Sequence, residues 1–348
     1  MSVEKIGVSK KGIETYALEN RNGMRVEVIT YGARLHKILL PSKMGTIDVL
    51  AGFDDVDGYT GVNPYFNATI GRFVNRIGRA TLTLNGKTYD LRANEGRNCL
   101  HGGKVGFDRR TFTCETVGDN AVKLTYVSPD GEENLPSELT ISVMYTLTDE
   151  NELKIRYDAI ADGDTIFNPT NHAYFNLDGD FVSVLDTKVF IDSTKMTLPD
   201  AELVSTGIVA DIQGTNFDFS KERTIGEGID KENEWFKNAL GGYDFNYTLR
   251  EDRDVNKPAA TAYSEKSGIK MEVYTDRPCL QLYSGNFLDG SVVGKKGNAY
   301  PYQSAFCMET QKDPSAYKSE AFPSVLLKGK EKFVSETVYA FRWKPERS

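Results

Sequence analysis

Histidine is informative in this sequence because it is scarce: the 348 residues include only His36, His101 and His172. An imidazole titrates near neutral pH, so one side chain can both donate and accept a proton. His101 precedes a Gly-Gly pair in NEGRNCLHGG, and His172 lies among asparagines and aromatics in FNPTNHAYFNLDGD. His36 lies in the apolar segment ARLHKILL, where a packed core histidine is the more ordinary role. We therefore expect acid–base chemistry from His101 or His172, although each could instead satisfy a turn or a strand end.

Two carboxylates stand out from the 50 acidic residues, most of which we expect on the solvated surface. Glu309 follows Cys307 and Met308 in SAFCMETQ, and Asp244 lies between aromatic residues in GGYDFNY. A carboxylate in apolar surroundings is costly unless it is paired or functional, and burial raises its pKa towards the range that a general base needs. Glu309 is therefore a candidate general base. The alternative is a buried ion pair, for example with an arginine.

Polar side chains that could bind hydroxyl groups accompany these residues. Arg72, Asn75, Arg76 and Arg79 cluster in TIGRFVNRIGRA, and Gln281 interrupts an apolar alternation in CLQLYSGNF. Asn75 and Arg76 could clamp a hydroxyl or a carboxylate, whereas the arginines together could hold a phosphate. No glycine-rich phosphate-binding motif precedes a helix here, which disfavours a nucleotide site. Gln281 could line a site or serve as a satisfied core amide.

The elements that must position these side chains are β-strands. Apolar and polar residues alternate in several segments, which predicts half-buried antiparallel strands over residues 24–29, 153–159, 269–275 and 338–341. Turn dipeptides separate the apolar runs at Asn22-Gly23, Asn85-Gly86, Asp130-Gly131 and Ser267-Gly268. The sequence therefore favours an all-β protein.

Helical periodicity is scarce, and only residues 220–228 and 233–240 could each hold a short helix. We expect one large antiparallel β domain over residues 1–348, built as two broad sheets packed face to face. Residues 205–260 are less regular, and we expect long loops there over one face.

Charge and composition narrow the range of partners. The net charge of −8 and pI of about 5.2 leave no basic surface for nucleic acid or an anionic membrane. No apolar stretch is long enough for a membrane span, and the charged N-terminus does not resemble a signal peptide. The four cysteines are widely spaced, without metal-binding spacing, and we expect free thiols in a cytoplasmic protein. The oligomeric state that we expect is a monomer or a weak homodimer.

Taken in order, these segments resemble the galactose mutarotase family of aldose 1-epimerases along nearly the whole chain. The matching segments are ETYALENRNGMRVEVITYGARL, DVLAGFDDVDGY, IGRFVNRI, NEGRNCLHGG, NPTNHAYFNL, GGYDFNY, LQLYSGNF and FCMETQ. LHGG, NPTNHxYFNL and ETQ are specific when they occur together in this order. The resemblance implies the galactose mutarotase-like supersandwich, a large antiparallel β-sandwich with few short helices.

The resemblance also implies a role for each candidate residue. Glu309 of ETQ corresponds to the general base, and His172 of TNHxYFNL corresponds to the general acid. The residues that the resemblance assigns to sugar binding are His101, Asn75, Arg76, Asp244 and Gln281.

The reaction that this implies is interconversion of the α and β anomers of a free aldohexose, such as galactose or glucose. Two positioned proton transfers suffice for this chemistry, so we expect no metal and no cofactor. Three alternatives remain open at this point: a hexose 6-phosphate mutarotase, a glycoside hydrolase that uses Asp244 with Glu309, and a non-catalytic sugar-binding protein.

Overall fold

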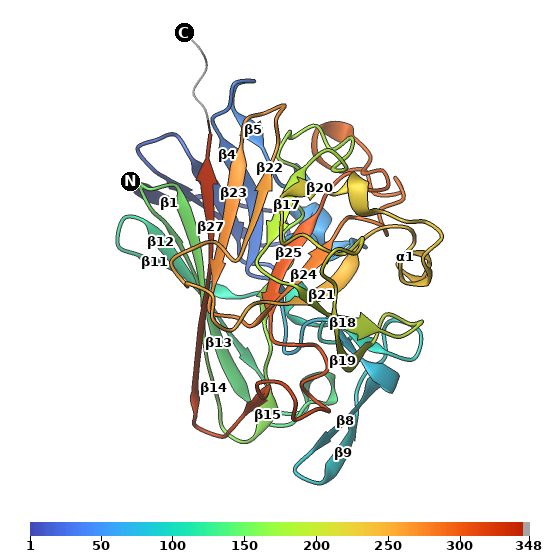
Figure 1. Ribbon diagram of the computed structural model, residues 1–348. Coiled ribbons are helices and arrows are strands. Elements are labelled where there is room, and N and C mark those ends of the chain that lie inside the picture. The colour runs from blue at the N-terminus through green and yellow to red at the C-terminus, as the bar shows by residue number, and fades with distance from the viewer. Residues whose placement is uncertain (344–348) are drawn as a thin grey trace.

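The computed structural model describes residues 1–343, which form a strand-rich molecule (Figure 1). Its N-terminal sheet contains, in spatial order, β1 (Ser2–Val8), β2 (Glu14–Glu19), β3 (Arg25–Ile29), β4 (Arg34–Leu40) and β5 (Ile47–Asp48). The central sheet contains β11 (Thr113–Val117), β12 (Ala121–Ser128), β13 (Leu139–Leu147), β14 (Glu152–Ala161), β27 (Lys332–Arg342), β23 (Lys270–Thr275), β22 (Ala260–Tyr263), β17 (Lys188–Ile191) and β20 (Arg223–Thr224).

A third sheet, the pocket sheet, contains β19 (Ser205–Asp211), β18 (Lys195–Pro199), β21 (Asp244–Thr248), β24 (Cys279–Tyr283) and β25 (Cys307–Gln311). Four two-stranded ribbons complete the strands: β6 (Thr69–Ile70) with β16 (Thr170–Asn171), β7 (Arg76–Ile77) with β10 (Cys99–Leu100), β8 (Thr81–Leu84) with β9 (Lys87–Asp90), and β15 (Thr165–Ile166) with β26 (Leu326–Leu327). Neighbouring strands in the pocket sheet pair antiparallel.

Helical structure is limited to short segments. The α-helix α1 (Glu234–Asn238) is joined by the 3-10 turns η1 (Val56–Thr60), η2 (Gly78–Ala80), η3 (Phe107–Arg109), η4 (Glu132–Asn134), η5 (Gly226–Gly228) and η6 (Lys295–Gly297). The predicted antiparallel sandwich with few short helices is therefore confirmed, although three main sheets replace the expected two. No helix within residues 1–343 is both long and apolar enough to cross a membrane.

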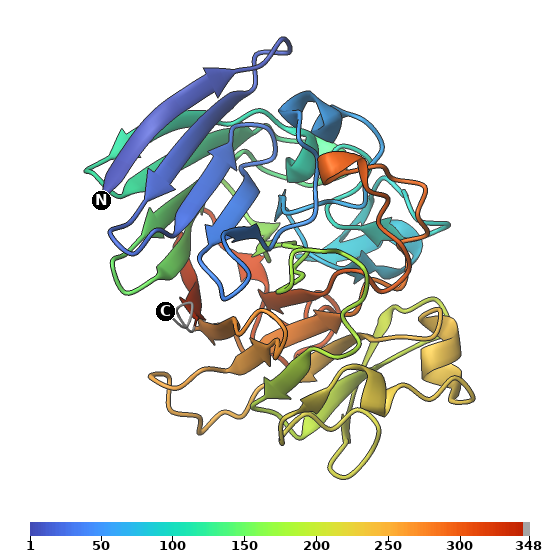
Figure 2. The same ribbon diagram turned by 90° about the horizontal axis from the view of Figure 1, so that it is seen from above.

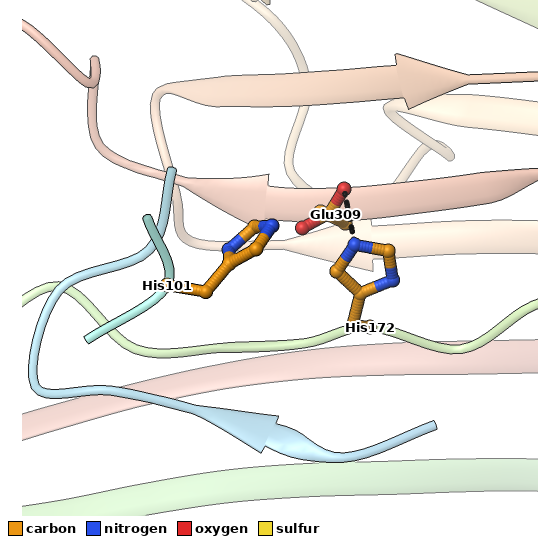
Figure 3. Close-up of side chains that lie close together, drawn as sticks. All are labelled: His101, His172 and Glu309. Carbon is orange, nitrogen blue, oxygen red and sulfur yellow. Dashed lines mark ion pairs between the residues drawn. The ribbon is translucent and has the colours of Figure 1, made fainter. Parts of the chain in front are cut away.

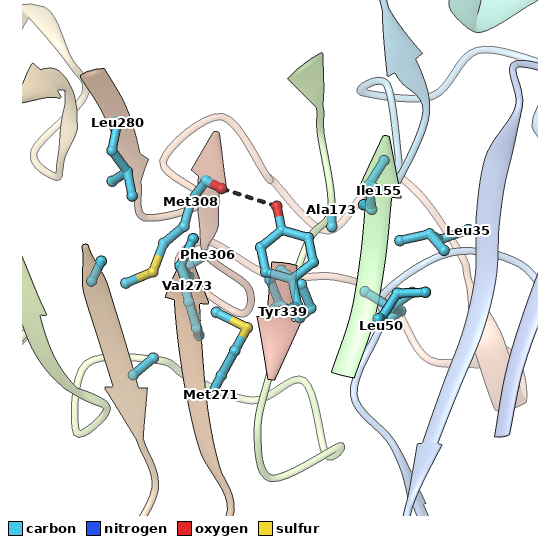
Figure 4. Packing of buried hydrophobic residues seen from close by; sticks show 14 of the residues in the cluster. Leu35, Leu50, Ile155, Ala173, Met271, Val273, Leu280, Phe306, Met308 and Tyr339 are labelled. Carbon is cyan, nitrogen blue, oxygen red and sulfur yellow. Dashed lines mark hydrogen bonds between the residues drawn. The ribbon is translucent and has the colours of Figure 1, made fainter. Parts of the chain in front are cut away.

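The core lies between the sheets. Seen from above, the N-terminal sheet, in blue, lies against the green strands of the central sheet (Figure 2). Leu35 of β4 faces Ile155 of β14, and Met308 of β25 belongs to the same buried cluster (Figure 4). The Tyr339 hydroxyl of β27 donates to the Met308 carbonyl at 3.1 Å, which links the central and pocket sheets. Burying one large apolar side chain, such as Leu35 or Ile155, stabilises the fold by about 2 kcal/mol.

Three of the four predicted strands match the structure well. β14 alternates buried and half-buried residues as expected, and so does β23. β3 is also a strand, but Glu27 and Ile29 are buried as well as Val26, because both of its faces are covered. The segment 338–341 also lies in a strand, β27, where Ala340 and Phe341 are buried and Val338 is half-buried; Thr337 and Tyr339, on the opposite face from Val338, are buried too.

Residues 205–260 were expected as long loops, and this is wrong in part. β19 and β21 both lie in this range, and β21 is a central strand of the pocket sheet. The strands were missed because apolar alternation is weak there. The predicted helix at 233–240 is confirmed as α1, whereas residues 220–228 contain β20 and η5. The single-domain organisation stays a prediction, and its last residues, 344–348, lie outside the described part of the chain.

Candidate active site

A cavity of about 230 Å³ opens at the end of the pocket sheet. Six of the seven predicted site residues line it, from five separate stretches of the chain: Glu309, His172, His101, Asn75, Arg76 and Asp244. The other lining residues are Pro64, Tyr65, Glu95, Leu100, Tyr174, Tyr283 and Phe287. A cavity of this size accepts a small, compact ligand rather than a polymer.

Glu309 reaches the cavity from the polar face of the pocket sheet. The antiparallel register places Asn246 of β21 opposite Gln281 of β24, and Gln281 opposite Glu309 of β25. Because side chains alternate along a strand, Glu309 shares its face with Gln311, while Met308 points to the core (Figure 4). Placing a carboxylate between core residues therefore exposes it to the cavity without disturbing the apolar face.

A β-ribbon brings the second group of residues together. Leu100 of β10 pairs with Arg76 of β7, so Asn75 and His101 lie side by side just beyond the paired residues. The Asn75 backbone N–H donates to His101 Nδ1 at 3.2 Å, and the His101 N–H donates to the Asn75 carbonyl at 3.1 Å. An N–H can only donate, so the neutral His101 ring carries its proton on Nε2. Burial, together with the charges that His172 and Arg76 can carry, holds the pKa of His101 well below its usual value.

His172 and Glu309 form the centre of the site. His172 Nε2 lies 3.6 Å from Glu309 Oε1, and the His101 ring lies beside them (Figure 3). The His172 ring stacks on Tyr174, with ring centroids 4.9 Å apart and planes 20° apart, which fixes its orientation. Its other nitrogen, Nδ1, lies 3.5 Å from the Cys307 thiol.

The electrostatics of this pair favour a single shared proton. Burial raises the pKa of Glu309 well above its ordinary value, and the nearby Asp244 carboxylate adds to this. Burial lowers the pKa of His172 to about 4. At a pH above the pKa of His172 and below the pKa of Glu309, the pair holds one proton in total. With the proton on Glu309 both side chains are neutral, and with the proton on His172 they form an ion pair. The site can therefore both take up and release a proton.

A second charged cluster lines the wall of the cavity. Arg76 Nε and Nη2 donate to the two Glu95 carboxylate oxygens at 2.6 and 2.7 Å, and Arg76 Nη1 lies 3.5 Å from Asp244 Oδ2. Burial raises the pKa of Asp244, although the Arg76 guanidinium counteracts this. Fixed donors and acceptors of this kind suit a ligand rich in hydroxyl groups.

Gln281 is the predicted residue that lies behind the cavity rather than in its lining. Its Nε2 donates to Asp244 Oδ1 at 2.7 Å, and its Oε1 accepts from Gln311 Nε2 at 3.3 Å. It therefore supports Asp244 from below, a role that lies between the two alternatives that the sequence left open.

The aromatic side chains of the cavity wall and Glu95 were not predicted from the sequence. Tyr174 is two residues after His172, at the spacing that returns a strand to the same face, and this signal could have found it. Tyr65 and Phe287 come from irregular loops with no such pattern. Glu95 lies in the segment NEGRNCLHGG, in which only His101 was a candidate.

The remaining candidates lie outside the cavity. Arg72 is buried and donates to the carbonyls of Ser128, Pro129 and Pro136, so its guanidinium is not available to a phosphate in the cavity. Arg79 is exposed and lines a separate surface groove. His36 is buried in β4, as expected for a core histidine. The four cysteines are free, as predicted.

Three of the lining residues could also approach a cation. One nitrogen of His101, one of His172 and one oxygen of Glu309 all lie within 4.8 Å of one another. Ligands of a tetrahedral zinc ion sit about 3.4 Å apart, given bonds of about 2.1 Å, so these side chains would have to close in. In their present arrangement they suit proton transfer to a small ligand better than metal binding.

The fold and the cavity define a strand-rich protein in which a buried histidine–glutamate pair lies beside a wall of polar and charged side chains. The sequence profile of the family described as aldose 1-epimerase matches residues 14–340, and the chain belongs to this family. It is 40% identical over 331 residues to the galactose mutarotase of Bos taurus, covering 94% of both chains. It is 32% identical to the aldose 1-epimerase of Escherichia coli K12, covering 93% of this chain and 94% of that protein.

Solved structures agree with this assignment. The chain is similar to an aldose epimerase homologue from C. elegans, with a TM-score of 0.87 and 30% identity over 94% of this chain and 98% of that one. It is also similar to the galactose 1-epimerase of Lactobacillus acidophilus, with a TM-score of 0.83 and 27% identity over 98% of both chains. The implied family and fold are thus confirmed, and the chain is an isomerase-type enzyme.

Proposed function

We propose that this enzyme interconverts the α and β anomers of a free aldohexose, such as galactose or glucose, with Glu309 as the general base and His172 as the general acid. One observation carries the assignment of the pair. Glu309 Oε2 is buried and has no hydrogen-bond partner among the described residues, while Oε1 faces His172 at 3.6 Å. A buried carboxylate oxygen without a partner is costly unless a ligand completes it. A sugar hydroxyl is a suitable donor for it.

Ring opening then follows from two proton transfers. Glu309 takes the proton of the C1 hydroxyl while His172 gives its proton to the ring oxygen, and the C1–O5 bond breaks to leave an aldehyde. Rotation about C1–C2 presents the other face of the aldehyde. Closure reverses both transfers: His172 takes back the proton from the C5 hydroxyl, Glu309 returns its proton to the C1 oxygen, and the enzyme regains its starting state.

The surrounding residues support these transfers. His101 presents its Nε2–H donor beside the pair, where it can bind the ring oxygen or a neighbouring hydroxyl. Asp244, Arg76 and Asn75 bind hydroxyls on the far side of the sugar ring. Holding the sugar against the pair lowers the barrier further, because the groups that react are already oriented.

The experiment follows the optical rotation of freshly dissolved α-D-galactose and α-D-glucose. We expect the wild-type protein to bring both to anomeric equilibrium much faster than the spontaneous reaction. Glucose 6-phosphate and an aryl galactoside serve as comparison substrates for the phosphorylated-sugar and hydrolase alternatives. An unchanged spontaneous rate with both free sugars would contradict the proposal, and so would release of the aryl group.

A further inference from the structure

Arg76 lies between two carboxylates, and the two contacts are unequal. Glu95 accepts from Nε and Nη2 in a bidentate pair at 2.6 and 2.7 Å, whereas Asp244 lies 3.5 Å from Nη1. A bidentate pair fixes the plane of a guanidinium, so Glu95 rather than Asp244 sets where Nη1 points. The Arg76 side chain is 7% exposed and that of Glu95 is 36% exposed, which places Glu95 towards the mouth of the cavity.

The same pairing determines the charge that a ligand meets. Without Glu95, the wall would present one guanidinium to one carboxylate, that of Asp244. With Glu95, two carboxylates face one guanidinium, and the Glu309–His172 pair adds no positive charge when it holds a single proton. An arginine in a sugar site would ordinarily attract a carboxylate or phosphate ligand. Here two carboxylates of the protein, Glu95 and Asp244, already face the positive charge of Arg76.

We propose that Glu95 is a specificity-determining residue, which orients Arg76 for neutral hydroxyl groups and, by adding a second carboxylate beside this one guanidinium, excludes anionic sugars from the cavity. This inference rests on the proposed anomer interconversion. It identifies the substrate class as uncharged aldoses, as opposed to uronates and sugar phosphates. A sugar ring is small enough that any anionic substituent would lie within about 10 Å of Glu95, a distance over which charges interact strongly in a partly buried site.

A glutamate–arginine ion pair outside the cavity provides a control. Glu202 pairs with Arg97, with 2.6 Å between Oε1 and Nη2, but neither residue lines the cavity. Glu202→Gln therefore removes one negative charge and one arginine partner, as Glu95→Gln does, without changing the sugar-binding wall. Glu95→Asp supplies the complementary variant, since it keeps the charge but shortens the reach to Arg76.

The experiment measures kcat/KM by polarimetry for D-galactose, D-galacturonate and the uncharged methyl ester of D-galacturonate. We expect Glu95→Gln to raise the ratio of galacturonate to methyl ester about tenfold, because one repelling charge is lost. The gain should shrink in 0.5 M salt, because salt already screens the Glu95 charge in the wild-type protein. Glu95→Asp should keep the wild-type ratio while raising KM for galactose more than it lowers kcat, and Glu202→Gln should match the wild type in all three respects.

The outcomes separate this inference from the proposed function. If Glu95→Gln turns over galactose but leaves the ratio of galacturonate to methyl ester unchanged, the charge role of Glu95 is wrong. If Glu202→Gln raises the ratio equally, the effect is one of overall charge, and the inference is again wrong. If the wild-type protein fails on galactose itself, the proposed function fails first, whatever Glu95 does.

Discussion

Residues 1–343 contain two buried histidine–glutamate pairs, and one of the two lies in the cavity. In the N-terminal sheet, His36 Nε2 lies 3.9 Å from Glu27 Oε2, and at the pocket sheet His172 Nε2 lies 3.6 Å from Glu309 Oε1. Both histidines are nearly inaccessible to solvent. Burial lowers the pKa of His36 to about 2 and that of His172 to about 4. By residue type, spacing and burial the two pairs are nearly alike.

They differ in what already satisfies the carboxylate. Glu27 lies 3.1 Å from Lys37 Nζ and 3.2 Å from Arg25 Nε, and the other ring nitrogen of His36 lies 3.2 Å from the Tyr59 hydroxyl. Glu309, by contrast, leaves one oxygen without a hydrogen-bond partner among the described residues. A pair whose bonds are complete stabilises the fold, whereas a pair with a missing partner is prepared for a ligand. A histidine beside a glutamate therefore does not by itself identify an active site.

The largest effects are expected when each pair is removed in turn. We expect Glu309→Gln and His172→Asn each to lower kcat by about 10²–10⁴-fold, the usual contribution of a positioned proton transfer. The matched variants Glu27→Gln and His36→Asn should keep kcat within about twofold and instead lower the free energy of unfolding by about 1–3 kcal/mol, because they leave buried polar groups unpaired. Polarimetry and urea unfolding measure the two effects.

Circular dichroism and the melting temperature of each variant provide the control for folding. The comparison fails if loss of the His36–Glu27 pair abolishes turnover in a protein that remains folded. It also fails if Glu309→Gln and His172→Asn both turn over galactose at the wild-type rate.

The pH dependence of turnover tests the shared proton of the inner pair. Activity requires one proton on the pair, so kcat/KM should form a plateau and fall about tenfold per pH unit below pH 4, where His172 and Glu309 both become protonated. It should fall again at high pH, once the raised pKa of Glu309 is passed and the proton is lost. Measured by polarimetry with correction for the spontaneous rate, a pH-independent profile from 3 to 10 would contradict the shared proton.

The pH dependence of stability tests the outer pair. His36 has a folded pKa of about 2, below its unfolded value of 6.5, so between these values the unfolded chain binds a proton that the folded protein does not. Its contribution to stability is therefore present above pH 6.5 and is lost as the pH falls. We expect the free energy of unfolding of His36→Asn to vary less steeply with pH below 6.5, by up to about 1.4 kcal/mol per pH unit. Urea unfolding at pH 4.5 to 8 measures the slope, and an unchanged slope would show that His36 is not held neutral.

Much of this arrangement could be predicted from the sequence, because it depends on local pattern. The alternation over residues 153–159 and 269–275 fixed two strands of the central sheet, and the LHGG and ETQ segments identified His101 and Glu309. These signals are carried by neighbouring residues, so one segment is enough to reveal them.

What could not be predicted depends on residues far apart in the chain. Lys37 of β4 lies opposite Glu27 only after β3 and β4 have paired, and this contact, added to that of Arg25 on the same strand, shows that Glu27 is satisfied. The bidentate contact of Glu95 with Arg76 likewise needs the β7–β10 ribbon to form. β21 was missed for a related reason: its polar residues are explained by the cavity they face, which the sequence does not show.

The smallest effect is expected at Gln281. It tests whether a residue behind the cavity acts only by supporting Asp244, which lines it. Gln281→Leu removes the 2.7 Å hydrogen bond to Asp244 Oδ1 without altering the cavity wall itself. Loss of one such bond costs about 1–2 kcal/mol, and we expect it as a rise of about fivefold to thirtyfold in KM for galactose, with kcat nearly unchanged. Asp244→Asn, which alters the lining directly, should raise KM further in the same polarimetric assay. If Gln281→Leu instead lowers kcat as strongly as Glu309→Gln, then Gln281 takes part in the chemistry, and its position behind Asp244 does not describe its role.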